Sequence, residues 1–138
     1  MTSPAAGGRI LLDTSAYAHF RRGHGEVVEI LAVAERVFLS TVTLGELEAG
    51  FALGSRPDEN RIALRDFLAE SFVGVVPIDH DVARRYGALF AALRRAGTPV
   101  PTNDIWIAAA ALHVAAELIT FDADFARLSG LHARVLAT

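Results

Sequence analysis

Four acidic residues stand where this sequence is expected to pass from one secondary-structure element to the next. Two follow short apolar runs typical of buried strands, and two fall in the expected first turns of helices. They are Asp13, Asp122, Glu46 and Asp104. A fifth acid, Asp124, lies two residues beyond Asp122 and can join them. If strand ends and helix starts meet at one edge of a sheet, these carboxylates share a site.

Carboxylates held close together repel one another, which raises some of their pKa values and destabilises the fold unless a cation neutralises them. Convergence therefore predicts a metal ion. Oxygen ligands suit Mg²⁺ or Mn²⁺. The chain has no cysteine, and its five histidines form no pair at helical ligand spacing, which argues against zinc. Mg²⁺ held by carboxylates is suited to phosphoryl chemistry, because it polarises a phosphate and activates water.

Each acid also has a purely structural interpretation. A strand-terminal aspartate such as Asp13 or Asp122 can cap a helix or form a turn. Asp104 can favour the positive end of its helix. The spacing from Thr43 to Glu46 fits a capping box, in which the glutamate reaches back to the start of the helix. These interpretations stay open one by one, but a shared site favours the metal.

Three polar neighbours have weaker claims on the same site. Thr14 and Ser15 can donate hydroxyl hydrogen bonds to a carboxylate or phosphate, although helix capping explains them about as well. Asn103 can orient Asp104 or a phosphate, with the same alternative. Trp106 can stack on RNA, but its apolar neighbours favour packing in the core or a dimer.

The elements that must position these residues alternate along the chain. Strands are expected at residues 9–12, 36–39, 73–78, 118–121 and 133–136. Helices are expected around residues 16–21, 26–34, 43–53, 57–71, 79–96, 103–115 and 123–128. Either Asp79 or Asp81 can cap the fifth helix. Strands joined by such helices pair in parallel, so the sequence predicts an α/β fold, a three-layer α/β/α sandwich with a central, mainly parallel sheet of about five strands.

Composition limits the classes of function. The chain has 138 residues, 52% of them apolar, and a formal charge of −3. This predicts one domain over residues 1–138, with residues 1–8 flexible. The negative charge argues against coating nucleic acid through bulk positive potential. The absence of lysine excludes a P-loop lysine and Schiff-base chemistry. No membrane segment or secretion signal is expected, and the lack of cysteine fits the cytosol.

Four segments carry the acids in a specific order. They are residues 10–15 (ILLDTS), 41–47 (TVTLGEL), 103–108 (NDIWIA) and 118–125 (LITFDADF). Together they resemble the PIN-domain family, and within it the VapC-like toxins of type II toxin–antitoxin pairs. The resemblance covers nearly the whole chain.

The resemblance implies that Asp13, Glu46, Asp104 and Asp122 bind Mg²⁺ or Mn²⁺, with Asp124 as a variable extra acid. It implies endonuclease activity that is selective for single-stranded RNA or for structured RNA, and we expect a metal-activated water to hydrolyse the phosphodiester. It also implies a homodimer and inhibition by an antitoxin whose tail enters the active-site groove.

Rival functions fit less well. A phosphatase of the haloacid dehalogenase kind also places an aspartate after its first strand, but it needs a second one two residues on, where this chain has Ser15, and it needs a lysine. A receiver-type phospho-acceptor lacks its lysine too. A PIN-fold interaction module without activity is expected to have lost an acid, and none is missing. A small antitoxin or adaptor is expected to show a disordered or DNA-binding segment, which the sequence does not show.

Overall fold

The structure, a computed structural model, describes residues 8–138. The flexibility predicted for residues 1–8 therefore falls outside the described residues, apart from Gly8. Its carbonyl accepts the backbone N–H groups of Glu35 and Arg36.

The central sheet has five strands in the order β3-β2-β1-β4-β5, and every neighbouring pair is parallel. The strands are β1 (Arg9–Leu12), β2 (Arg36–Ser40), β3 (Val73–Val76), β4 (Glu117–Thr120) and β5 (Ala133–Val135). Their apolar composition suits burial on both faces, as parallel sheets require. The predicted parallel sheet of five strands is confirmed.

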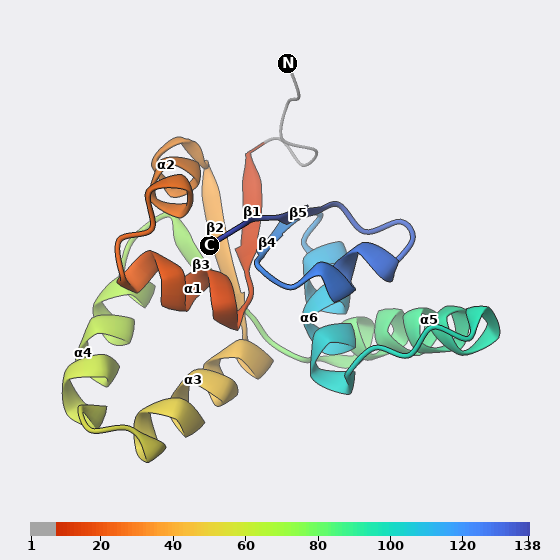
Figure 1. Cartoon of the computed structure of the whole chain (residues 1–138), viewed down its shortest axis with the longest axis horizontal. Coiled ribbons are helices and arrows are strands. Elements are labelled where there is room, and N and C mark those ends of the chain that lie inside the picture. Colours follow the sequence, from red (N-terminus) through yellow and green to blue (C-terminus); the bar gives the residue numbers. More distant parts are fainter. Residues whose placement is uncertain (1–7) are drawn as a thin grey trace.

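Helices cover both faces of this sheet (Figure 1). Four of them share one apolar core with the sheet: α1 (Thr14–Arg21), α2 (Gly25–Val33), α3 (Thr41–Leu53) and α4 (Pro57–Leu68). A second core joins the other face to α5 (His80–Ala96), α6 (Thr102–His113) and the 3-10 helix η1 (Ala123–Arg127). Alternation within β1 divides the two cores, because Ile10 and Leu12 enter the first and Leu11 the second. The three-layer α/β/α sandwich is confirmed.

The order of the strands determines where a site can form. From β1 the chain moves outward through β2 and β3, then returns to place β4 on the opposite side of β1. In an open parallel sheet, such a reversal opens a crevice beyond the carboxyl ends of the two central strands. Asp13 directly follows β1, and Asp122 lies two residues beyond β4. Both acids therefore stand at the reversal.

The start of α3 differs from the sequence-based prediction. The helix begins at Thr41, and the Ser40 hydroxyl accepts the Thr43 backbone N–H at 3.1 Å as the N-cap. Thr43 is thus already inside the helix, so the predicted capping box from Thr43 to Glu46 is wrong. Glu46 lies in the second turn rather than the first, and its carboxylate is free to take part in tertiary contacts.

Other helix starts agree more closely. Asp104 lies in the first turn of α6, as predicted, although the helix begins at Thr102 rather than at residue 103 and Pro101 is its N-cap. Asp79, and not Asp81, caps α5 by accepting the Val82 N–H. Within residues 8–138, no helix combines the length and the apolar character that crossing a membrane demands.

Candidate metal centre

Asp13 is fixed in place by hydrogen bonds from two different elements. Its Oδ1 accepts the Ala16 backbone N–H and the Ser15 hydroxyl, both at 2.8 Å, and its Oδ2 accepts the Thr120 hydroxyl. Asp13 therefore caps α1, as its structural interpretation requires, and also links α1 to the end of β4. Its side chain is almost fully buried, and this burial raises the pKa of the carboxyl, with a further rise from the charge of Asp122.

Glu46 is oriented by the polar neighbours that the sequence singled out. Its Oε1 accepts the Thr14 hydroxyl, and its Oε2 accepts the Asn103 side-chain N–H at 3.2 Å. Thr14 begins α1 and Asn103 lies in the first turn of α6, so this one carboxylate connects three helices. Asn103 contacts Glu46 rather than Asp104.

Three carboxylates lie close enough to hold one ion. Asp104, Asp122 and Asp124 each present an oxygen, and these atoms all lie within 4.8 Å of one another. The loop after β4 arranges two of them: the Asp122 N–H donates to the Thr120 hydroxyl at 2.9 Å, and the Asp124 N–H donates to Asp122 Oδ1 at 2.9 Å. Asp124 is thus part of the tightest group, not an outlier.

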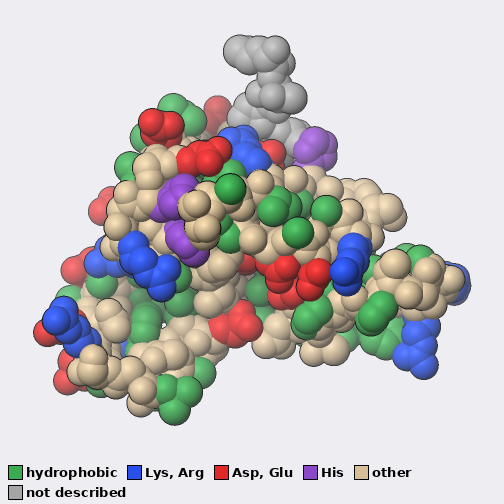
Figure 2. Space-filling model, viewed as in Figure 1, with side chains coloured by type: hydrophobic (Ala, Val, Ile, Leu, Met, Phe, Trp, Pro, Cys, Tyr) green, Lys and Arg blue, Asp and Glu red, His purple; other side chains and the backbone are tan. Residues whose placement is uncertain are grey.

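Electrostatics connect the other four acids to Asp104. Partial burial raises the pKa of Asp104 to about 6, with further contributions from the charges of Asp122, Glu46, Asp13 and Asp124. The charge of each of these four acids therefore disfavours the ionised form of Asp104. In Figure 2 acidic side chains gather at the centre of the face shown, between the region of α3 and that of α5 and α6.

The donor set fits a hard divalent cation. It consists of carboxylate oxygens, and a bound cation relieves the repulsion that raises the pKa of Asp104. One basic side chain lies at the rim, where Arg127 approaches Asp124 Oδ1 at 3.4 Å and donates to the Pro99 carbonyl at 3.2 Å. Arg127 thereby links η1 to the loop that leads into Asp104.

Sequence reasoning missed Thr120 and Arg127. Thr120 is fully buried and binds both Asp13 and the backbone of Asp122. A polar residue inside the otherwise apolar run from Leu118 to Phe121 was the available signal. Trp106, by contrast, packs as expected: its ring stacks on Tyr86 with centroids 3.9 Å apart, against the second core.

Comparisons with known proteins agree with this geometry. The family model described as "PIN domain" matches residues 10–131. Ribonuclease VapC5 of Mycobacterium tuberculosis is 37% identical over 131 residues, which is 94% of this chain and 92% of that protein.

Two solved structures share the fold. One, from Mycobacterium tuberculosis, is described as a member of the VapBC family of toxin-antitoxin systems, VapBC-5; it has a TM-score of 0.71 at 32% identity and covers 95% of this chain and 99% of its own. The other, DNA-bound VapBC from Salmonella typhimurium, has a TM-score of 0.81 at 26% identity and covers 92% and 97%.

Proposed function

The chain belongs to the PIN-domain family, and from that premise we propose that it is a divalent-metal-dependent endoribonuclease, the toxin of a toxin–antitoxin pair. We propose one PIN domain over residues 1–138. The observation that carries the proposal is the group of Asp104, Asp122 and Asp124, whose carboxylate oxygens lie within 4.8 Å of one another at the reversal of the sheet. The charges of Glu46 and Asp13 add to the rise in the pKa of Asp104. A cap or a turn needs one acid, whereas a bound cation relieves the repulsion among several carboxylates in one place.

Each acid has a distinct part in the proposed site. Asp13 is the fixed point, because its hydrogen bonds prevent the carboxylate from turning away. Glu46 is held toward the same site by Thr14 and Asn103. The remaining ligands are Asp104 in the first turn of α6, Asp122 at the N-cap of η1 and Asp124 within η1.

Mg²⁺ or Mn²⁺ is the ion we propose for these ligands. When bound, it supplies Lewis-acid activation of water and neutralises charge on the phosphate. The positions of the carboxylates determine where the positive charge of the ion would lie. In a chain of net charge −3 they also make RNA affinity depend on metal, since unneutralised acids repel the phosphate backbone.

Cleavage of RNA that requires Mg²⁺ or Mn²⁺ and stops with chelator is the first expected result. Purified protein is incubated with total cellular RNA and the cut ends are mapped. Because water is the proposed nucleophile rather than a 2′-hydroxyl, the ends should be a 5′-phosphate and a 3′-hydroxyl. Cleavage that persists in chelator, or 2′,3′-cyclic phosphate ends, would contradict the mechanism.

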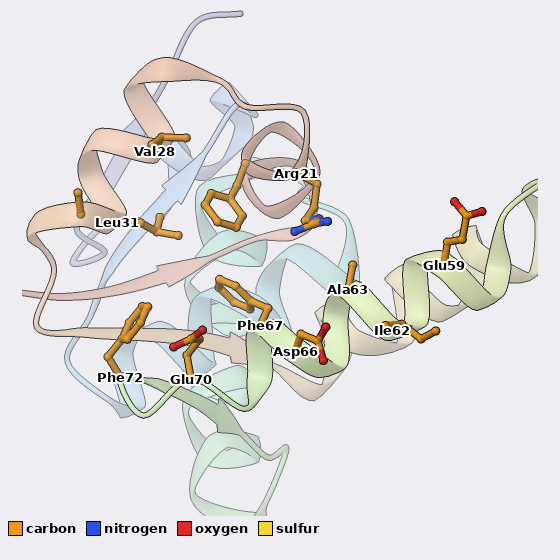
Figure 3. A pocket seen from close by; sticks show the side chains of 12 residues that line it. Arg21, Val28, Leu31, Glu59, Ile62, Ala63, Asp66, Phe67, Glu70 and Phe72 are labelled. Atoms are coloured by element: carbon orange, nitrogen blue, oxygen red, sulfur yellow. The ribbon is translucent and has the colours of Figure 1, made fainter.

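Besides the active-site groove that the family resemblance implies for the antitoxin's tail, a second groove outside the candidate metal centre is a surface that we propose for the antitoxin. It has a volume of about 680 Å³ and runs between α1, α2 and α4. Apolar side chains line it, among them Val28, Leu31, Ile62 and Phe67. The charged side chains around it are three acids and one base: Glu59, Asp66, Glu70 and Arg21 (Figure 3). This pattern suits an apolar segment of the antitoxin flanked by basic residues.

Ile62→Glu is expected to weaken antitoxin binding by at least about tenfold, because it places a charge among the apolar contacts of the groove. Cleavage by the free protein should not change, since Ile62 is half-exposed on α4 and outside the acidic site. Calorimetric titration with the cognate antitoxin measures the effect. Leu53→Glu is the matched control, because Leu53 is 90% exposed and does not line the groove. Equal antitoxin binding by both variants would mean that the antitoxin does not bind in this groove.

We further propose a homodimer, which the family resemblance implies. We also propose that the protein acts in the cytoplasm, where it would meet its RNA substrate. Exposed Phe90, beside the stacked pair Tyr86 and Trp106, offers apolar surface for a second copy. Light scattering on the purified chain decides between the 14.8 kDa monomer and a particle of twice that mass.

A further inference from the structure

Three aromatic rings lie together beside the acidic site. His19 of α1 stacks on Phe121, with ring centroids 3.9 Å apart and an interplanar angle of 21°. His24 meets both rings edge-on, at 5.0 Å from Phe121 and 5.7 Å from His19. All three residues are partly exposed. We call His19, His24 and Phe121 the ring cluster.

Ser15 connects the ring cluster to the candidate metal centre. Its hydroxyl donates to Asp13 Oδ1 at 2.8 Å and accepts the Phe121 backbone N–H at 3.2 Å. Its carbonyl lies 2.9 Å from His19 Nδ1, which must be the donor because a carbonyl only accepts. Phe121 is also the residue directly before Asp122. The ring cluster therefore adjoins two of the proposed metal ligands.

The contacts of His19 hold its ring in one orientation. Phe121 covers one face of the ring, and the hydrogen bond to Ser15 fixes one edge. A side chain that is already ordered loses little rotamer entropy when a ligand stacks against it. The ring cluster is thus prepared to receive a flat partner.

We propose that the His19–Phe121 stack supports one unpaired nucleobase of the RNA next to the phosphate that is cut. This inference rests on the proposed ribonuclease function. Aromatic rings stack with every kind of base, and RNA-binding proteins commonly recognise single strands in this way. The acids repel the phosphate backbone, so a stacking contact beside them, which attracts a base rather than a phosphate, helps to hold the substrate. The platform favours unpaired RNA and selects weakly among the four bases.

His19→Ala should weaken the binding of a single-stranded oligoribonucleotide by about fivefold to a hundredfold, the range for losing one stacked base. Binding is measured by fluorescence anisotropy in CaCl₂, which replaces MgCl₂ to slow cleavage. His19→Phe keeps a flat ring and should bind within about twofold of the unchanged protein. His132→Ala is the control, because His132 is exposed and precedes β5, at the amino ends of the strands, whereas Phe121 follows β4 at their carboxyl ends.

A series of oligonucleotides with one base removed gives the decisive comparison. The unchanged protein should lose affinity at one abasic position by the same factor as His19→Ala loses on intact RNA, and His19→Ala should lose nothing more there. The proposed platform would be overturned if the losses of affinity from the abasic position and from His19→Ala multiplied. It would also be overturned if His19→Ala bound intact RNA as tightly as the unchanged protein. If the protein binds RNA with this pattern but does not cleave it in MgCl₂, the platform stands and the ribonuclease fails. A protein that binds no RNA contradicts both.

Discussion

Asp104→Asn is expected to lower RNA cleavage by at least about a thousandfold. The substitution keeps the size of the side chain but removes the charge at the point where the other four acids converge. Metal assistance to phosphodiester hydrolysis amounts to several kcal/mol, and each 1.36 kcal/mol is about a factor of ten in rate. Initial rates on a defined oligoribonucleotide in saturating Mg²⁺ provide the measurement.

Asp58→Asn is the matched control for this variant. The Asp58 side chain is 95% exposed on α4, where it lies 3.9 Å from Arg61 of the same helix. Its substitution should leave cleavage unchanged. If Asp104→Asn kept more than about a tenth of the activity, an effect of less than about 1.4 kcal/mol, the carboxylate would not be a metal ligand of the reaction.

The same variant should change how stability depends on pH in metal-free buffer. The pKa of Asp104 is raised from 3.8 to about 6 in the folded chain, so the folded state binds the proton more tightly than the unfolded state. The contribution of this group to stability is fully present below about pH 4 and is lost as the pH rises through about 6.

Linkage alone gives about 3 kcal/mol for such a shift, and the half-exposed position of Asp104 reduces this to about 1–2 kcal/mol. Urea unfolding at about pH 4 and about pH 7.5 should therefore show a smaller difference in Asp104→Asn than in the unchanged chain. Identical pH profiles would mean that burial and the neighbouring acids do not raise the pKa of Asp104.

Residues at strand ends were the most predictable part of the site. Asp13 and Asp122 follow apolar runs, and parallel strands bring such positions to one edge whatever the details of the loops. Asp104 was predictable for a similar reason, because the Gly97 to Pro101 break leaves little choice about where the next helix begins.

Contacts between distant residues were not predictable. The Thr14 hydroxyl reaches Glu46 across 32 positions, and the Thr120 hydroxyl reaches Asp13 across 107. Local sequence patterns contain no information on such pairs. The predicted start of α3 was wrong for a local reason. Ser40 and Thr43 both make good N-caps, and only the end of β2 at Ser40 decides between them.

Asp13 combines a structural and a proposed metal-binding role, and two substitutions at this position separate them. Asp13→Ala removes the acceptor for the Ala16 N–H and the buried Thr120 hydroxyl, which should cost about 2–3 kcal/mol of unfolding free energy. Asp13→Asn keeps Oδ1 as the acceptor at the helix start, and its amide can donate to the Thr120 oxygen. Since burial already raises the pKa of Asp13, loss of its charge removes an unfavourable term.

We therefore expect Asp13→Asn to unfold within about 1 kcal/mol of the unchanged chain while Asp13→Ala falls well below it, and both to lose cleavage as completely as Asp104→Asn. Urea unfolding in metal-free buffer measures the first quantity, and oligonucleotide cleavage in Mg²⁺ the second. Cleavage retained by Asp13→Asn would leave Asp13 a helix cap alone. Equal destabilisation by both substitutions would mean that the fold depends on the charge of Asp13 and not on its hydrogen bonds.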